Sequence, residues 1–145
     1  MTIEARISIT LAAAWCLLGC EAPSEPTLEA RFSAVEVNGQ PVPDLLYVRD
    51  ADWKITLLEA TIDFERAGRY RRTVRVRYDT RDSVYVQEIV DSGRYRVGKG
   101  VIALASEMGR SFDTLLDFSR PESLRQRYEL MPALVTFRRN PRIVP

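Results

Sequence analysis

The chain has 145 residues, a formal net charge of +1 and an apolar fraction of 46%. This size and composition are typical of one globular domain with one core, and the balanced charge excludes nucleic acid as an implied partner. The chain contains no histidine, which excludes the Ser-His and Cys-His nucleophile pairs and removes the commonest zinc ligand.

The first 19 residues have the pattern of a secretory signal. Residues 1–6 are polar, and the twelve residues Ile7–Leu18 carry no charge. Such a run is shorter than the about 20 residues of a membrane-spanning helix. It fits the apolar region of a signal peptide, which is roughly 7–15 residues long. The sequence therefore predicts a cleaved leader over residues 1–19.

The leader ends in Leu17-Leu18-Gly19-Cys20. This segment resembles the lipobox of bacterial lipoproteins. The resemblance implies that Cys20 becomes the first residue and carries a diacylglycerol thioether and an N-terminal acyl chain such as palmitate. A buried helix, or an ordinary cleaved signal with a chance cysteine, is the competing interpretation.

Residues 20–31 are predicted to be a short tether between the anchor and the domain. Glu21–Thr27 is polar and contains prolines, as a flexible linker does, and two or three acyl chains anchor a protein stably. In lipoproteins, an aspartate directly after the lipidated cysteine signals retention in the inner membrane. This chain has Glu21 at that position, so the analogy favours the outer membrane. We expect a lipid-anchored protein of the cell envelope, facing the periplasm.

The clearest structural signal is a β-hairpin over residues 53–78. Apolar residues alternate with polar ones, the phase shifts at Leu57-Leu58 as in a β-bulge, and Arg66-Ala67-Gly68 has the composition of a three-residue turn. Pairing Glu65 with Arg69 sets the register. An acidic outer face then meets a basic one: Asp63 faces Arg71 and Glu59 faces Arg75.

Further strands follow at short intervals. The period-two pattern begins at Phe32. After the hairpin, Val84–Val90 is a predicted strand that is apolar on both faces and therefore central. The other predicted strands are Arg94–Val97, Gly100–Ala105, Arg110–Phe118, Leu124–Leu130 and Ala133–Arg138. Asp91-Ser92-Gly93 and Gly98-Lys99 are predicted turns. Eight or nine strands without a helix predict an all-β fold, a small antiparallel up-and-down barrel. A β-sandwich is the alternative.

Three segments carry a family resemblance. Three stretches resemble lipocalin-like domains of bacterial lipoproteins: the opening Phe32–Pro43, the hairpin Gly93–Leu104 and the final strand Leu134–Arg139. The resemblance covers most of residues 32–139 and implies a lipocalin-like barrel there, with a C-terminal tail over 140–145. It implies no catalytic residues.

Alternation also predicts which side chains point into the barrel. They are Val35, Val37, Ile55, Ala60, Ile62, Phe64, Tyr70, Val74, Val76, Tyr78, Tyr95, Ile102, Leu104, Phe112, Leu116, Phe118, Tyr128, Val135 and Phe137. Arg72 and Gln126 are polar residues on this inner face. A buried guanidinium needs an anionic or polar partner.

We therefore predict a ligand site at Tyr70, Arg72, Tyr95 and Tyr128, where Arg72 would hold the anionic head of a fatty acid or similar amphiphile. The alternative is that Arg72 sits at the rim or pairs internally and the tyrosines belong to the core. No set of residues predicts a catalytic site, a metal site or a cofactor. The expected function is a non-enzymatic, lipid-anchored binding protein; the alternative is a filled barrel that acts as a structural or protein-interaction module.

Overall fold

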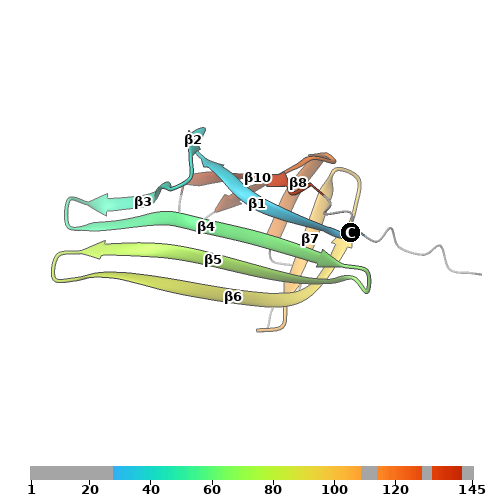
Figure 1. Ribbon diagram of the computed structural model, residues 1–145, viewed down its shortest axis with the longest axis horizontal. Coiled ribbons are helices and arrows are strands. Elements are labelled where there is room, and N and C mark those ends of the chain that lie inside the picture. Colours follow the sequence, from blue (N-terminus) through green and yellow to red (C-terminus); the bar gives the residue numbers. More distant parts are fainter. Residues whose placement is uncertain (1–27, 109–113, 129–131, 142–145) are drawn as a thin grey trace, which may run out of the picture.

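The computed structural model describes residues 28–108, 114–128 and 132–141 (Figure 1). The predicted leader, Cys20 and most of the predicted tether lie outside these ranges, as does Phe112. The described residues contain strands and no helix. The strands are β1 (Ala30–Val37), β2 (Gln40–Pro41), β3 (Asp44–Asp50), β4 (Trp53–Glu65), β5 (Arg69–Thr80), β6 (Val84–Val97), β7 (Val101–Ser106), β8 (Thr114–Arg120), β9 (Ser123–Tyr128) and β10 (Ala133–Arg139).

The predicted antiparallel barrel is confirmed. The strands pair in the order β2-β1-β10-β9-β8-β7-β6-β5-β4-β3, and β1 also pairs with β4, so that eight strands close into a barrel and β2 and β3 are additional. Every pairing is between antiparallel neighbours. The β1–β4 pairing joins the two ends of the eight-stranded sheet, whereas each sheet of a sandwich would keep two free edges.

The predicted β4–β5 hairpin has the expected register. Glu65 pairs with Arg69, Asp63 with Arg71 and Glu59 with Arg75, and the register shifts between Leu57 and Glu59. Gly68 has a φ of 69°, the left-handed conformation that the three-residue turn requires.

The interior of the barrel is filled by side chains. The largest fully buried ones come from β1, β4 and β7–β10: Phe32, Val37, Leu57, Ile62, Ile102, Leu104, Leu116, Leu124, Val135 and Phe137. Most of the predicted inward list is buried or packs against this core. The exception is Val35, which lies where β1 has a bulge between Ala34 and Glu36. The bulge changes the phase of β1, so that Phe32 and Val37 both point inward.

Two predictions about residues 84–97 are wrong. Asp91-Ser92-Gly93 is no turn, because β6 runs unbroken through it and pairs with β5 along its length. A Cβ on Gly93 would lie 1.9 Å from the carbonyl oxygen of Ala105. Glycine therefore allows β6 to approach β7 closely at the point where their pairing begins.

Val84–Val90, predicted to be central, is exposed throughout. This half of β6 belongs to a four-stranded extension of the barrel, formed by residues 44–57 and 74–91. β4 pairs with β1 over Thr61–Phe64 and with β3 over Trp53–Leu57, so its first half continues past the barrel. Figure 1 shows β3–β6 running side by side to the left, with β6 at the rim.

One face of the extension carries a row of aromatic rings. Tyr47 and Trp53 pack edge to face with ring centroids 5.7 Å apart, and Tyr78 and Tyr85 stack at 5.0 Å. Since Trp53 also contacts Tyr78 at 6.5 Å, the row connects all four strands. Such pairs stabilise a sheet beyond the area they bury.

Candidate functional site

An apolar cavity lies between the extension and the barrel. It has a volume of about 190 Å³ and is lined by residues of five strands: Leu46, Ile55, Arg72, Val74, Val76, Tyr78, Ile89, Asp91 and Tyr128. Leu46, Ile55 and Val76 also belong to the buried core, so the cavity borders the packed interior. We call it the Arg72 cavity, after its one cation.

Arg72 pairs internally with Asp91, one of the arrangements that the sequence allows. The two residues face each other across β5 and β6, and the Nη2 of Arg72 donates to the Oδ2 of Asp91 at 2.9 Å. Both side chains are largely buried, with exposed fractions of 18% and 14%. A buried ion pair is tolerated when further hydrogen bonds satisfy its remaining atoms.

The Asp91 carboxylate receives such hydrogen bonds. The hydroxyl of Tyr70 donates to its Oδ2 at 2.8 Å, and the hydroxyl of Ser106 donates to its Oδ1 at 2.6 Å. The carboxylate is therefore held by three donors from its two neighbouring strands, β5 supplying two of them and β7 the third. This fixes the orientation of the guanidinium that it pairs with.

The other half of that guanidinium is unsatisfied. The Nη1 of Arg72 is buried and has no hydrogen-bond partner within the described ranges; the Oε1 of Gln126 is the other such side-chain atom there. Leaving a buried charged donor unpaired is costly, and most such groups in native proteins bind something. Arg72 thus carries an unsatisfied donor and also lines the cavity.

Tyr128, at the end of β9, lines the cavity opposite the extension. Burial raises the pKa of its hydroxyl, while the positive charge of Arg72 lowers it to a smaller extent. The hydroxyl therefore stays protonated at neutral pH. It is a neutral polar group in a mostly apolar lining, as is usual for sites that bind small molecules.

Tyr95 lies apart from the other three predicted site residues. Its hydroxyl lies 2.6 Å from the Leu28 carbonyl oxygen and 2.9 Å from the Glu65 carbonyl oxygen, either of which can accept its one proton, and it accepts from the Leu28 N–H at 2.9 Å. Burial raises the pKa of Tyr95, and the hydrogen bond from the Leu28 backbone lowers it by less. Tyr95 thus fastens the start of the described chain to the β4–β5 turn.

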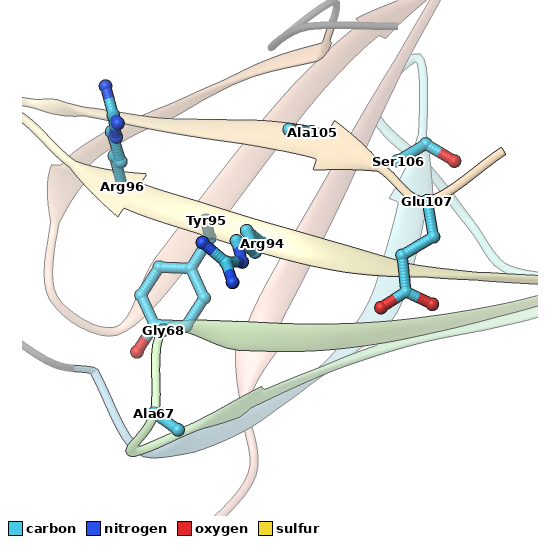
Figure 2. Close-up of a pocket in the computed structure, with 8 residues that line it drawn as sticks. All are labelled: Ala67, Gly68, Arg94, Tyr95, Arg96, Ala105, Ser106 and Glu107. Carbon is cyan, nitrogen blue, oxygen red and sulfur yellow. The ribbon is translucent and has the colours of Figure 1, made fainter. Parts of the chain in front are cut away.

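Tyr95 lines a second, more open groove of about 570 Å³, together with Gly68, Arg94, Ser106 and Glu107. Figure 2 shows Tyr95 directed at the turn around Gly68, with Ser106 and Glu107 at the far end of the groove. Glu107 pairs with Arg69 at 2.7 Å. This groove is more open and less apolar than the Arg72 cavity, so it encloses the apolar part of an amphiphile less well.

The structure thus brings together Arg72 and Tyr128 in one lining, with Tyr70 joined to them through Asp91, and leaves Tyr95 elsewhere. Sequence reasoning missed Asp91, because it assigned that residue to a turn. The signal that could have identified it is its spacing: Asp91 continues the alternation of Tyr85, Gln87 and Ile89, which places it on the face of Arg72.

In the described parts of the chain, no helix is long and apolar enough to cross a membrane. No three His, Cys, Asp or Glu side chains of these parts are grouped so that they could hold a metal ion. The chain matches no known protein family and no curated protein.

Proposed function

We propose that this protein is a bacterial envelope lipoprotein whose barrel, resembling lipocalin-like domains, binds a small amphipathic molecule without catalysing a reaction. The acyl groups on Cys20 hold it at the membrane, on the periplasmic side of the outer membrane. The ligand occupies the Arg72 cavity. The protein thus has two partners: a membrane surface, and a ligand that is an apolar molecule with an anionic or polar head.

The observation that carries this proposal is the unpaired Nη1 of Arg72 beside an apolar lining. A carboxylate or phosphate oxygen would accept from Nη1, and the apolar part of the same molecule would contact Val74, Val76 and Ile89. Charge-assisted hydrogen bonds of this kind are about twice as strong as neutral ones. The ligand would thereby satisfy the half of the guanidinium that Asp91 leaves free.

The size of the cavity limits what enters it. At about 190 Å³ it is smaller than most ligand sites, which have roughly 300–1,000 Å³, and comparable to an engineered cavity of about 150 Å³ that binds benzene. We therefore infer that the head and the first carbons of the ligand enter. The remainder lies along the row of aromatic rings of the extension, of which Tyr85 is exposed.

The filled interior of the barrel favours a second candidate, a structural or protein-interaction module. With no room at the centre of the barrel, binding is confined to the surface of the extension or to its border with the core. The exposed apolar residues of β6 are the observation that supports this second candidate.

The test of the ligand proposal is a binding titration of dodecanoate and dodecanol, which differ in their heads. We expect dodecanoate to bind at least about tenfold more tightly, which corresponds to about 1.4 kcal/mol. Ile89→Trp, which fills the cavity, should abolish this binding. Val90→Trp, one residue along on the opposite face, should preserve it. Equal binding to all three proteins, or none to any, would refute the proposal.

A further inference from the structure

The first half of β6 has a free edge. β5 pairs with Val84–Arg94 of β6, whereas β7 pairs only with Gly93–Val97. Two backbone hydrogen bonds show which way the groups of this segment point. On the β5 side, the Ser83 carbonyl accepts from the Thr80 N–H; on the opposite side of β6, the Ser92 carbonyl accepts from the Glu107 N–H. In this antiparallel pattern the backbone groups of even-numbered residues point away from β5. No strand of the described ranges pairs with them before Gly93.

This edge has little of the usual protection against pairing, since Glu88 is the one charged residue in Val84–Val90. Val84–Val90 contains no proline, no lysine and no bulge, which are the devices that keep edge strands from associating. Its apolar side chains are exposed on both faces of the sheet: Val84 66%, Tyr85 48%, Val86 53%, Ile89 42% and Val90 42%. A strand with these properties is suited to pair with another strand.

We propose that a second copy of this chain occupies the edge, with two β6 strands pairing antiparallel about a two-fold axis at Gln87. In this register Val84 faces Val90 of the copy and Tyr85 faces Ile89. Val86 faces Glu88, and the two Gln87 side chains meet. β-branched and aromatic–aliphatic pairs of this kind stabilise antiparallel strands.

The charges on β6 favour this register over its neighbours. Centring the axis on Glu88 would place two carboxylates directly opposite each other, which is unfavourable. Centring it on Val86 would leave Ile89 and Val90 facing the β5–β6 turn of the copy. The axis at Gln87 pairs the whole of Val84–Val90 and places no two like charges directly opposite each other. The strand is thus complementary to itself, as an isologous interface requires.

Pairing would join the two extensions into one continuous sheet. Paired residues lie on the same face of a sheet, so Ile89, which lines the Arg72 cavity, would contact Tyr85 of the copy. The two cavities would then open on one shared face. This inference goes beyond the proposed function, because the dimer forms with or without a ligand.

Disulfide trapping in the full-length chain tests the proposal. Gln87→Cys would place two thiols in a non-hydrogen-bonded pair with Cα atoms about 4.5 Å apart, which suits a disulfide. In Glu88→Cys the two cysteines would each face Val86, with their Cα atoms more than about 7 Å apart. After mild oxidation we expect at least about fivefold more reduction-sensitive dimer from Gln87→Cys than from Glu88→Cys. The chain without these substitutions gives the amount of disulfide-linked dimer that forms through Cys16 and Cys20 alone.

A second comparison uses charge in the Gln87→Cys background. Val86→Lys would face Glu88 of the copy and keep the dimer, whereas Val86→Asp would face the same carboxylate and lose most of it. Equal trapping by Gln87→Cys and Glu88→Cys, or equal effects of lysine and aspartate, would overturn the register. A disulfide from the thiol of Gln87→Cys to a different protein, or no dimer at all, would overturn the proposal that the occupant is a second copy.

Discussion

Arg72 and Asp91 face each other across β5 and β6 and form an ion pair of 2.9 Å that is mostly buried. The pair joins the extension to the core, since Tyr70 and Ser106 donate to the same carboxylate. Its stabilising value and its part in ligand binding can be tested separately, because Asp91 has no free donor to offer an anion.

Asp91→Ala should lower the free energy of unfolding by about 3 kcal/mol, because it leaves the Arg72 guanidinium uncompensated in a largely buried position. Urea unfolding measures this loss. The matched control is Asp79→Ala, which removes an exposed pair with Arg77 at 3.0 Å and should cost less than about 1 kcal/mol. Similar losses in the two variants would show that the Arg72–Asp91 pair contributes no more than a surface pair.

Glu59 and Arg75 should show a weak coupling. Their side chains are 3.5 Å apart and about half exposed, and pairs of this kind contribute roughly 0.2–1 kcal/mol. A double-mutant cycle with alanine, measured by urea unfolding, should give a coupling in that range that falls with added salt. The same cycle for Glu59 with Arg71, which faces Asp63 instead, should give less. A coupling of zero for Glu59 and Arg75 would contradict the prediction.

Gly93→Ala should destabilise the protein by about 3 kcal/mol or more, because its Cβ would lie 1.9 Å from the Ala105 carbonyl oxygen and the backbone of β7 would have to move. Gly98→Ala is the control, since its Cβ would meet the nearest heavy atom, the Val101 carbonyl oxygen, at 3.6 Å. Thermal unfolding of the two variants checks this, and equal midpoints would contradict the close approach of β6 and β7.

Alkaline pH should weaken the fold through Tyr95 and Tyr128, whose pKa values are raised mainly by burial. A tyrosine with a raised pKa in the folded state keeps its proton there after the unfolded chain has lost it. Stability is therefore full below about pH 10 and falls as the pH rises through the folded-state pKa values. Urea midpoints measured upward from pH 9 check this. In Tyr128→Phe the decline should be shallower; an unchanged decline would contradict the contribution of Tyr128.

Cys20→Ser should leave the precursor unprocessed or release the protein from membranes, because acylation requires the thiol. Fractionation followed by mass determination of the chain measures both effects. Cys16→Ser is the control, since Cys16 belongs to the predicted leader and its replacement should change neither. Normal processing and unchanged membrane attachment of Cys20→Ser would refute the predicted lipid anchor.

The barrel and its central hairpin could be predicted because their signals are local. Between Trp53 and Thr80 the alternation of apolar and charged residues, the doublet at Leu57 and the glycine of the turn all indicate one register. A hairpin needs no information from distant residues, and the observed pairing of Glu59 with Arg75 follows from the turn and the bulge alone.

β6 was misread because its signals are ambiguous. An apolar run such as Val84–Val90 fits a central strand or an unprotected edge equally well, and only the place where β7 begins to pair distinguishes them. Gly93 likewise fits a turn or a close approach of two backbones. Both ambiguities are resolved only by knowing where β7 pairs with β6, and β7 lies later in the chain.

The candidate site was predictable in part. Arg72 could be identified because polar groups on an apolar face are rare, and Tyr128 because alternation places it on the inner face; the structure places both on one cavity. Alternation gives the face of a strand but not the height along the barrel. Tyr95 therefore lies beyond the first residue of β5, near the β4–β5 turn, where it holds Leu28.

The attachment of Leu28 to Tyr95 determines how the domain can stand above a membrane. The eight peptide units between a lipid on Cys20 and this fixed point would span at most about 30 Å. The far loops of the extension lie the length of β5 away from it, about 40 Å for twelve residues in a strand. If Cys20 carries the proposed lipid, the end with the Glu65–Gly68 turn would therefore stay near the bilayer, and the free edge of β6 would lie farther from it.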